Sequence, residues 1–153
     1  MLQSIKGPWG QQEVDEFLAA GEHPIRLACN GADGFPRVVS LWYRYHAKQI
    51  HCVMHRDARI LRMLQARPLV GFDISPNQPP YHGVRGQGTA QTQKLGDADT
   101  LDQMLVNYLG DTQSNLAQWL LERREEEVLV SITPTRLFTW DYRERMKDIE
   151  AKK

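Results

Sequence analysis

The sequence predicts a mainly β fold, a small antiparallel β-barrel with helices at its periphery. Roughly six or seven short runs of β-branched and aromatic residues are separated by turns rich in Gly, Pro, Asn and Asp. Helical patterns interrupt these runs at only a few places, whereas a doubly wound parallel sheet needs a helix between most of its strands. The chain of 153 residues has the size of one domain, and we expect a single domain over residues 1–153.

The first elements are a helix and a short strand. Val14 and Leu18 recur at helical spacing and Gly21 stands where a C-terminal cap is needed, which predicts a helix from about Gln11 to Ala20. Ile25–Cys29 is a short apolar run, and the NGADGFP segment that follows it is typical of a turn.

A hairpin is expected next. Val38–Tyr45 and Gln49–Met54 are rich in β-branched and aromatic residues, and only residues 46–48 separate them. Two such runs with a short connection predict a pair of antiparallel strands.

A short basic helix follows the hairpin. Asp57 can cap its N-terminus, Ile60, Leu61 and Leu64 form an apolar face, and Pro68 ends it. We therefore expect one amphipathic helix between the hairpin and the next strand.

The middle of the chain contains two further strands. Leu69–Ile74 is apolar enough for a central strand, and the prolines of SPNQPPYHG exclude the segment after it from a strand interior. Val84–Thr92 alternates in polarity and contains Gly86 and Gly88, which indicates a bulge or a close approach of two backbones.

Two helices and two strands complete the predicted fold. The helices are marked by apolar residues from Leu101 to Leu109 and from Leu116 to Leu120. The last strands are expected over Glu127–Thr133 and Arg136–Trp140, with a break at Pro134. The tail after Arg143 is polar and is expected to be frayed.

Composition argues against several classes of function. Lys plus Arg and Asp plus Glu number 19 each, so the net charge is zero and a nucleic-acid-coating role has no basic surplus to support it. No apolar run approaches the ~20 residues of a membrane helix, and the first residues lack the apolar core of a secretory signal. We expect a cytoplasmic protein without nucleic-acid or membrane partners.

Cysteine and histidine give no metal or disulfide pattern. Cys29 and Cys52 stand alone in predicted strands, which is typical of buried thiols in a reducing compartment. His51 and His55 point to the same side of an extended strand, but no third ligand is spaced to join them. We expect no metal site.

The stretch from Phe35 to Gln91 resembles the FMN-binding split-barrel proteins, the pyridoxamine 5'-phosphate oxidase-like family. It shows the family's order of strand, turn, strand, basic helix, strand, loop and strand, and Gly88-Thr89-Ala90 resembles the family's recurring G-x-A strand. The resemblance covers about residues 10–142. It implies an antiparallel, Greek-key-like split barrel, an FMN cofactor, a small-molecule substrate and a homodimer whose cofactor sites lie between subunits.

The resemblance implies a phosphate site at the start of the basic helix. Met54 and His55 precede this junction, and Arg59 and Ile60 occupy the positions where relatives carry basic residues. Arg grips phosphate through paired hydrogen bonds, and a helix N-terminus attracts anions. A solvated basic helix face without a ligand is the alternative.

The resemblance places the flavin ring beside the strand that contains Val39, Ser40, Leu41 and Trp42, whose main chain would bind the pyrimidine portion. Trp42 can equally belong to the core, and Arg37 can face the phosphate or solvent. Trp140 matches the aromatic position near the end of the last strand, where relatives approach the flavin of the partner subunit. An aromatic residue at a dimer interface without a ligand is the alternative for Trp140.

Two classes of function follow. The first is an FMN-dependent oxidoreductase that moves a hydride or electrons to a small molecule; the chain lacks the C-terminal Arg-Leu-His-type motif of true pyridoxamine 5'-phosphate oxidases, and a deazaflavin-dependent reductase is a close variant. The second is a stress-response module that binds flavin or heme without turnover. Because no catalytic triad or carboxylate pair stands out, hydrolysis has little support.

Overall fold

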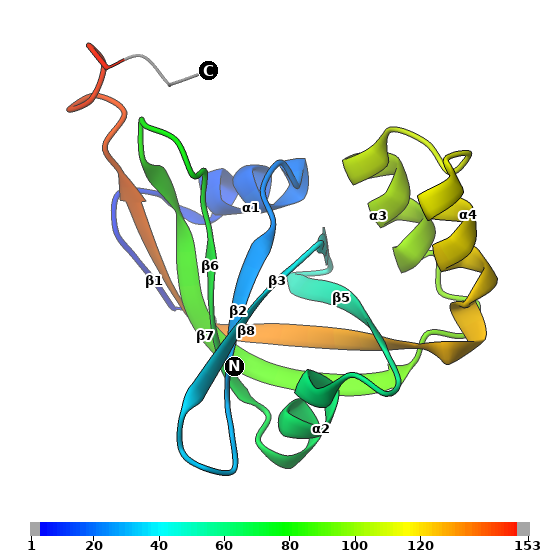
Figure 1. Cartoon of the computed structure of the whole chain (residues 1–153). Helices are drawn as coiled ribbons and strands as arrows, with labels where there is room; N and C mark the ends of the chain where they lie inside the picture. The colour runs from blue at the N-terminus through cyan, green and yellow to red at the C-terminus, as the bar shows by residue number, and fades with distance from the viewer. Residues whose placement is uncertain (1–3, 150–153) are drawn as a thin grey trace.

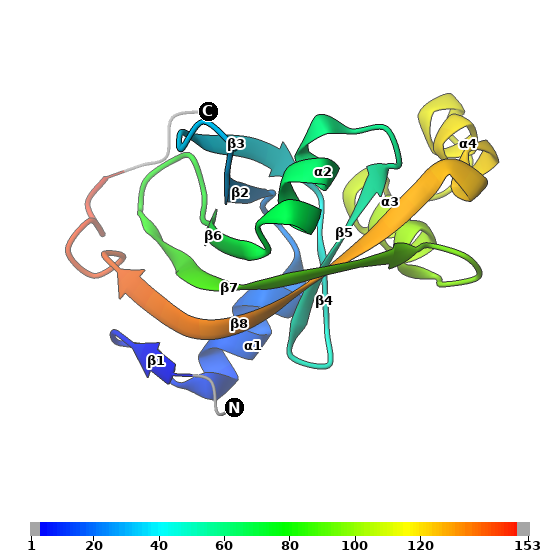
Figure 2. The ribbon, with the colours of Figure 1, turned by 90° about the horizontal axis from the view of Figure 1, so that it is seen from below.

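The structure, a computed structural model, describes residues 4–149 and consists of one curled sheet with helices around it (Figure 1). The sheet has eight strands in the order β3-β2-β6-β7-β8-β5-β4, and β1 pairs with β8 outside this path. All neighbours on the path are antiparallel, whereas β1 is parallel to β8. Figure 2 shows that the sheet is curled and that α2 lies at its open side. The strands are β1 (Ser4–Lys6), β2 (Ile25–Asn30), β3 (Pro36–Leu41), β4 (Arg44–His46), β5 (Gln49–His55), β6 (Leu69–Ile74), β7 (His82–Lys94) and β8 (Glu127–Asp141).

The helices lie at the periphery of the sheet, as the sequence predicts. They are α1 (Gln11–Ala20), α2 (Arg59–Ala66), α3 (Thr100–Leu109) and α4 (Asn115–Glu122), followed by a 3-10 turn, η1 (Arg124–Glu126). The expected bounds of α1 are confirmed, and Gly21 caps it in the left-handed region at φ 58°. Among the described residues, no helix is both long and apolar enough to cross a membrane.

The expected strand over Val38–Tyr45 is wrong, because the run is divided between the two ends of the sheet. β3 ends at Leu41 and pairs with β2, whereas β4 begins at Arg44 and pairs with β5. Tyr43 lies between them with a side chain only 2% exposed, and its hydroxyl donates to the carbonyl of Leu18 at 2.9 Å. Because this side chain is buried against α1, the chain cannot continue the pairing of β3 with β2 beyond Leu41. The expected hairpin is confirmed only for β4 and β5.

The expected break at Pro134 is also wrong, because β8 runs without interruption from Glu127 to Asp141. Pro134 faces Gly88 next to a register shift between Gln87 and Gly88, where the ladder is already irregular and a missing N–H is tolerated. A Cβ on Gly88 would lie 2.5 Å from the Thr133 carbonyl oxygen, so the expected close approach is confirmed. The irregularity also lies at Gly88, but its extra residue is Thr135 on β8. The segment Arg136–Trp140 is consequently not an edge strand, since β7 borders it along its length and β1 covers part of its other side.

Buried residues form two clusters that lie on opposite faces of the sheet near β5. The larger cluster fills the inside of the curl and includes Cys52 and Met54 of β5. The smaller cluster lies beneath α3 and α4, and Trp42 and Val53 pack against it. Because side chains alternate along a strand, β5 contributes to both clusters.

Candidate functional site

An apolar pocket of about 340 Å³ opens between the sheet and helices α3 and α4. We call it the Trp42 pocket. The end of β3 and the residue after it contribute Ser40, Leu41 and Trp42, and the helices contribute Leu101, Met104 and Leu120. Val53 of β5 and Glu127 of β8 also line it. Its size and apolar walls are those of a small-ligand site.

Contacts with α3 hold the Trp42 ring in place. The ring stacks on Tyr108 with centroids 5.3 Å apart and planes inclined by 10°. The Tyr108 hydroxyl donates to the carbonyl of His23 at 3.1 Å and accepts from the amide of Tyr43 at 3.4 Å. One wall of the pocket is therefore a fixed aromatic surface rather than a mobile side chain.

Glu127 is the acidic group of the pocket. The residue is 7% exposed, and no group in residues 4–149 donates a hydrogen bond to its carboxylate, whose oxygens are not fully buried. Burial raises the pKa of this carboxyl, and the nearby Arg123 and His55 only partly offset that effect. The sequence did not single out Glu127, because it closes a run of three glutamates that is typical of a solvated surface.

The N-terminus of α2 lies just beyond the end of β5. Asp57 does not cap it, so this expectation is wrong: the N-cap is Ala58, which has no side chain to accept a bond. The Asp57 amide instead donates to Nδ1 of His55 at 3.1 Å, which commits Asp57 to the turn before the helix. The first amides of α2, at Arg59 and Ile60, have no carbonyl one turn earlier to bond.

His55 is fixed by two hydrogen bonds. Because Nδ1 accepts from the Asp57 amide, the proton lies on Nε2, which donates to Oε2 of Glu126 at 3.0 Å. The bond from His55 is the largest cause that lowers the pKa of Glu126. Thus Nε2 of His55 is already bonded to the Glu126 carboxylate of η1 and is not free to bind a ligand.

Three arginines surround the start of α2 and carry no carboxylate partner. Arg56, Arg59 and Arg62 are exposed, and no ion pair joins any of them to an acidic side chain within residues 4–149. Free guanidinium groups beside free helix amides form an anion-binding arrangement. Asp57 and Glu126 lie at the same end and reduce its positive potential.

The other predicted cofactor residues are distributed over the two faces of the sheet. Val39, Leu41 and Ile60 pack against the larger cluster, and the Met54 side chain is buried inside it. Of the residues predicted to border the ring, Ser40, Leu41 and Trp42 line the pocket.

Arg37 belongs to a turn rather than to the pocket. It faces Cys29 across the β2–β3 ladder. Its guanidinium group binds Oδ2 of Asp33 at 2.7 Å and the carbonyl of Phe35 at 3.1 Å. The contact with Arg37 holds the pKa of Asp33 below its usual value.

Trp140 lies far along β8 from the Trp42 pocket. It stands one residue before the end of the strand whose first residue is Glu127. The Arg85 guanidinium carbon is 5.4 Å from its ring centroid, and Gly83 is its partner across the ladder. One chain does not bring Trp140 to its own pocket.

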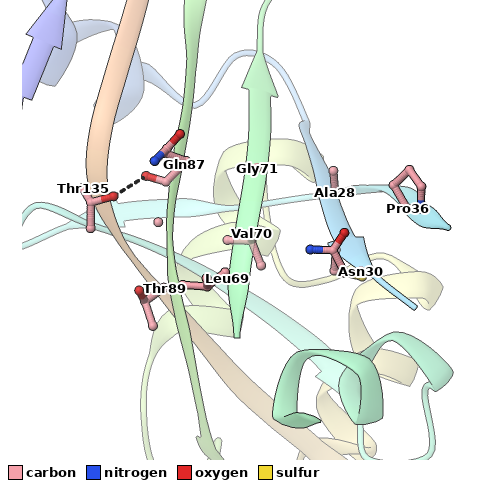
Figure 3. A pocket seen from close by; sticks show the side chains of 11 residues that line it. Ala28, Asn30, Pro36, Leu69, Val70, Gly71, Gln87, Thr89 and Thr135 are labelled. Atoms are coloured by element: carbon pink, nitrogen blue, oxygen red, sulfur yellow. Dashed lines mark hydrogen bonds between the residues drawn. The ribbon is translucent and has the colours of Figure 1, made fainter. Parts of the chain in front are cut away.

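A second hollow, of about 430 Å³, lies on the outer face of the sheet (Figure 3). Figure 3 shows it between β2, β6 and β7, with the Thr135 hydroxyl donating to the Gln87 carbonyl at 3.3 Å. Ala28 and Gly71 form its floor side by side in the ladder. Its lining carries amides, hydroxyls and apolar atoms but no charged side chain.

Comparison with solved structures identifies the architecture. A conserved hypothetical protein, Rv2991, from Mycobacterium tuberculosis matches with a TM-score of 0.77 at 19% identity, over 100% of this chain and 96% of that one. An F420 reductase matches with a TM-score of 0.63 at 16% identity, over 86% and 98% of the two chains. A putative pyridoxamine 5'-phosphate oxidase from Listeria innocua matches with a TM-score of 0.62 at 16% identity, over 83% and 97%.

The chain has the split-barrel fold of the pyridoxamine 5'-phosphate oxidase-like proteins. Other split barrels that match are named as an FAD-binding protein and a heme storage protein, so proteins of this fold differ in the cofactor they hold. No protein-family model and no curated protein matches the sequence.

Within this split barrel, the Trp42 pocket and the α2 N-terminus offer two complementary surfaces. The pocket presents apolar walls and an aromatic ring, which suit a flat heterocycle. The helix start presents amides and guanidinium groups, which suit an anion. The two are linked through β5, because Val53 lines the pocket and the strand ends two residues later at His55.

Proposed function

We propose that this split-barrel protein binds FMN and serves as a flavin-dependent oxidoreductase acting on a small molecule. The observation that carries the proposal is the Trp42 pocket, which is lined by Ser40, Leu41 and Trp42, the residues expected to border the flavin ring. The pocket lies at the same end of β5 as the arginine-rich start of α2. A ring surface and an anion surface that are connected through β5 match the two parts of FMN.

The residues divide the binding work between them. The ring would lie against Trp42 and between the apolar side chains of α3 and α4, which exclude water from it. The phosphate would be held by Arg59 and the amides of Arg59 and Ile60. FMN supplies the hydride or electron transfer itself, and the protein binds and orients it.

The proposal includes a homodimer. Phe35, Val38 and Leu69 are large apolar side chains that are 68%, 65% and 67% exposed. Val38 and Leu69 lie on the outer face of the sheet beside the hollow of Figure 3, because Val38 pairs with Ala28, which pairs with Gly71. An apolar face of this kind is stabilised by a second copy of the chain. The outer face also carries Trp140, which in a dimer would approach the flavin of the other subunit.

A second candidate is a ring-binding protein without turnover. Asp57 and Glu126 stand beside Arg59 and oppose a phosphate, which favours a cofactor held mainly by its ring. A flavin or heme held through its ring fits this candidate, which would serve as a stress-response module without catalysis. A deazaflavin-dependent reductase is a separate, catalytic alternative.

An absorption spectrum of the purified protein tests the proposal first. The two visible bands of oxidised flavin are expected, whereas a Soret band would indicate heme and a single shorter-wavelength band a deazaflavin. If the protein is purified without a cofactor, titration with FMN should quench flavin fluorescence and saturate at one FMN per chain. Absence of saturable FMN binding would overturn the proposal.

A further inference from the structure

Among the described residues, Glu127 is the one acidic residue that is buried. The buried polar or charged residues within 4–149 are Thr100, Thr139 and Glu127, and only Glu127 can ionise near neutral pH. An ionised carboxylate in an apolar site is costly unless donors satisfy its oxygens. No group in residues 4–149 donates a hydrogen bond to Glu127, and its carboxylate oxygens are not fully buried, because the one fully buried side-chain N or O atom without a partner in this part of the chain is Nη1 of Arg26.

The charged groups around Glu127 are committed to other partners. His55, its neighbour across the β5–β8 ladder, donates to Glu126. Arg123 lies 3.6 Å from Glu126 and 4.1 Å over the ring of Trp119. Glu126 accepts both of these contacts and only repels Glu127. The carboxylate of Glu127 can therefore accept a hydrogen bond from a ligand in the Trp42 pocket, which Glu127 lines.

We propose that Glu127 determines which heterocycle the Trp42 pocket accepts, by taking a hydrogen bond from an N–H on the ring edge. The inference rests on the proposed function and makes it more specific. The pyrimidine edge of a flavin or deazaflavin carries one such N–H, at N3, between two carbonyl groups. A metalloporphyrin has no free ring N–H, and a phosphate or carboxylate would be repelled.

The orientation of the ligand follows from the same charge. Glu127 excludes an anion from the inner part of the pocket, so the phosphate of FMN must lie toward Arg59 outside it. The ring edge with N3 then points to β8 and the ring face lies against Trp42. Glu127 is thus a specificity residue for the cofactor rather than a group that takes part in electron transfer.

Proton release on binding is the accompanying signature. A ring N–H stabilises the ionised form of Glu127, so the ligand lowers a pKa that burial raises in the free protein. Binding should therefore release protons where free Glu127 is partly protonated, and affinity should increase as pH rises through that region. The phosphate of FMN has a second pKa of about 6 and can itself release a proton when it binds Arg59. Riboflavin, which has no phosphate, therefore isolates the contribution of Glu127.

The decisive experiment compares FMN with N3-methyl-FMN on the full chain and on two variants. Wild type should bind FMN about 10-fold to 100-fold more tightly than N3-methyl-FMN, the range for a hydrogen bond to a charged group. Glu127→Gln keeps a neutral acceptor and should keep part of this preference. Glu127→Leu keeps the size of the side chain and removes the acceptor, so it should bind the two ligands equally.

The Leu variant separates hydrogen bonding from crowding. If the methyl group were rejected by size alone, Glu127→Leu would retain the full preference for FMN, and the inference would be overturned. Glu125→Gln, in the exposed 3-10 turn, is the matched control and should behave as wild type. Calorimetry of riboflavin binding in two buffers with different ionisation enthalpies should show proton release for wild type and none for Glu127→Gln.

The outcomes distinguish the inference from the function on which it rests. If FMN binds but wild type does not discriminate against N3-methyl-FMN, FMN binding stands and the role of Glu127 is overturned. If neither ligand binds to wild type, the proposed function and this inference are both overturned. Circular dichroism of each variant confirms that the comparison is made between folded proteins.

Discussion

The rings of Trp42 and Tyr108 stack with their centroids 5.3 Å apart and their planes inclined by only 10°. Trp42 lies in the link between β3 and β4, whereas Tyr108 lies in the last turn of α3, more than sixty residues later. This one contact fixes α3 over the pocket, and the hydrogen bonds of the Tyr108 hydroxyl reinforce it. The wall of the pocket and the helix that covers it are therefore positioned together.

Trp42→Leu tests whether this wall contacts the flavin. An indole near an isoalloxazine ring quenches its fluorescence, so bound FMN should be brighter in the variant. Loss of the aromatic pair should also lower the free energy of unfolding by about 0.5–1.5 kcal/mol, in addition to the loss expected from the smaller buried surface area. Steady-state fluorescence and urea unfolding measure the two effects. Trp119→Leu, an exposed tryptophan on α4, is the control, and equal brightening in both variants would remove Trp42 from the site.

Arg59→Ala tests the phosphate site. We expect FMN affinity to fall by about 1.5–3 kcal/mol, because a charge-assisted hydrogen bond is lost. Riboflavin, which has no phosphate, should bind the variant and wild type alike. Arg62→Ala, one turn further along α2, should have a smaller effect, and Asp57→Asn should strengthen FMN binding by removing a repulsive charge. Fluorescence titration gives all of these affinities, and unchanged FMN binding in Arg59→Ala would contradict the assignment.

Glu127→Gln should stabilise the protein without ligand at neutral pH. Burial raises the pKa of Glu127 above its ordinary value of 4.5, so the folded state binds its proton more tightly than the unfolded state does. Its contribution to stability is complete below pH 4.5 and is lost as pH rises through the higher folded value. The variant should thus have the higher Tm at pH 7, and the difference should shrink on acidification below 4.5. Calorimetry across pH measures this, and a difference that grows at low pH would show that the carboxylate is stabilised.

Leu69→Lys tests the homodimer. The substitution places a charge on the exposed apolar face, where a second subunit would have to desolvate it. Sedimentation should give a dimer for wild type and a monomer of about 17.6 kDa for the variant at micromolar concentration. Val106→Lys, at an exposed position on α3, should remain dimeric. A monomeric wild type would contradict the proposed assembly.

Local sequence signals accounted for much of the fold. Periodic apolar residues and Gly21 predicted α1 with its bounds, and Gly88 predicted the place of the ladder irregularity, whose extra residue is Thr135 on β8. The errors arose where tertiary contacts override local preference. The chain departs from the strand at Tyr43 because this side chain is buried under α1. The strand continues through Pro134 because Gly88, opposite it, has no side chain to collide with it. In both cases the deciding partner, α1 for Tyr43 and Gly88 for Pro134, lies far away in the sequence, so local patterns do not reveal it.

The candidate site was predicted only in part, for a related reason. The end of β3 was placed beside the ring because its order along the chain resembles a known family, and the structure puts Ser40 and Trp42 in a pocket. Glu127 was missed because its burial depends on α3 and α4 lying over β8. Asp57 was expected to cap α2, but its amide is used by the turn at His55. Arg59 lies at the helix start as expected, and its role in binding stays a prediction.

The link between β3 and β4 has a consequence for how the chain can vary. These strands stand at opposite ends of the sheet order, yet only Trp42 and Tyr43 separate them in sequence. The barrel is therefore closed at this point by covalent bonds instead of a ladder of hydrogen bonds. Adding a residue here would introduce slack between the two ends of the sheet and change the spacing of the pocket walls. Related chains should vary in length in the Pro-rich segment over residues 75–81 and should keep the two-residue link constant.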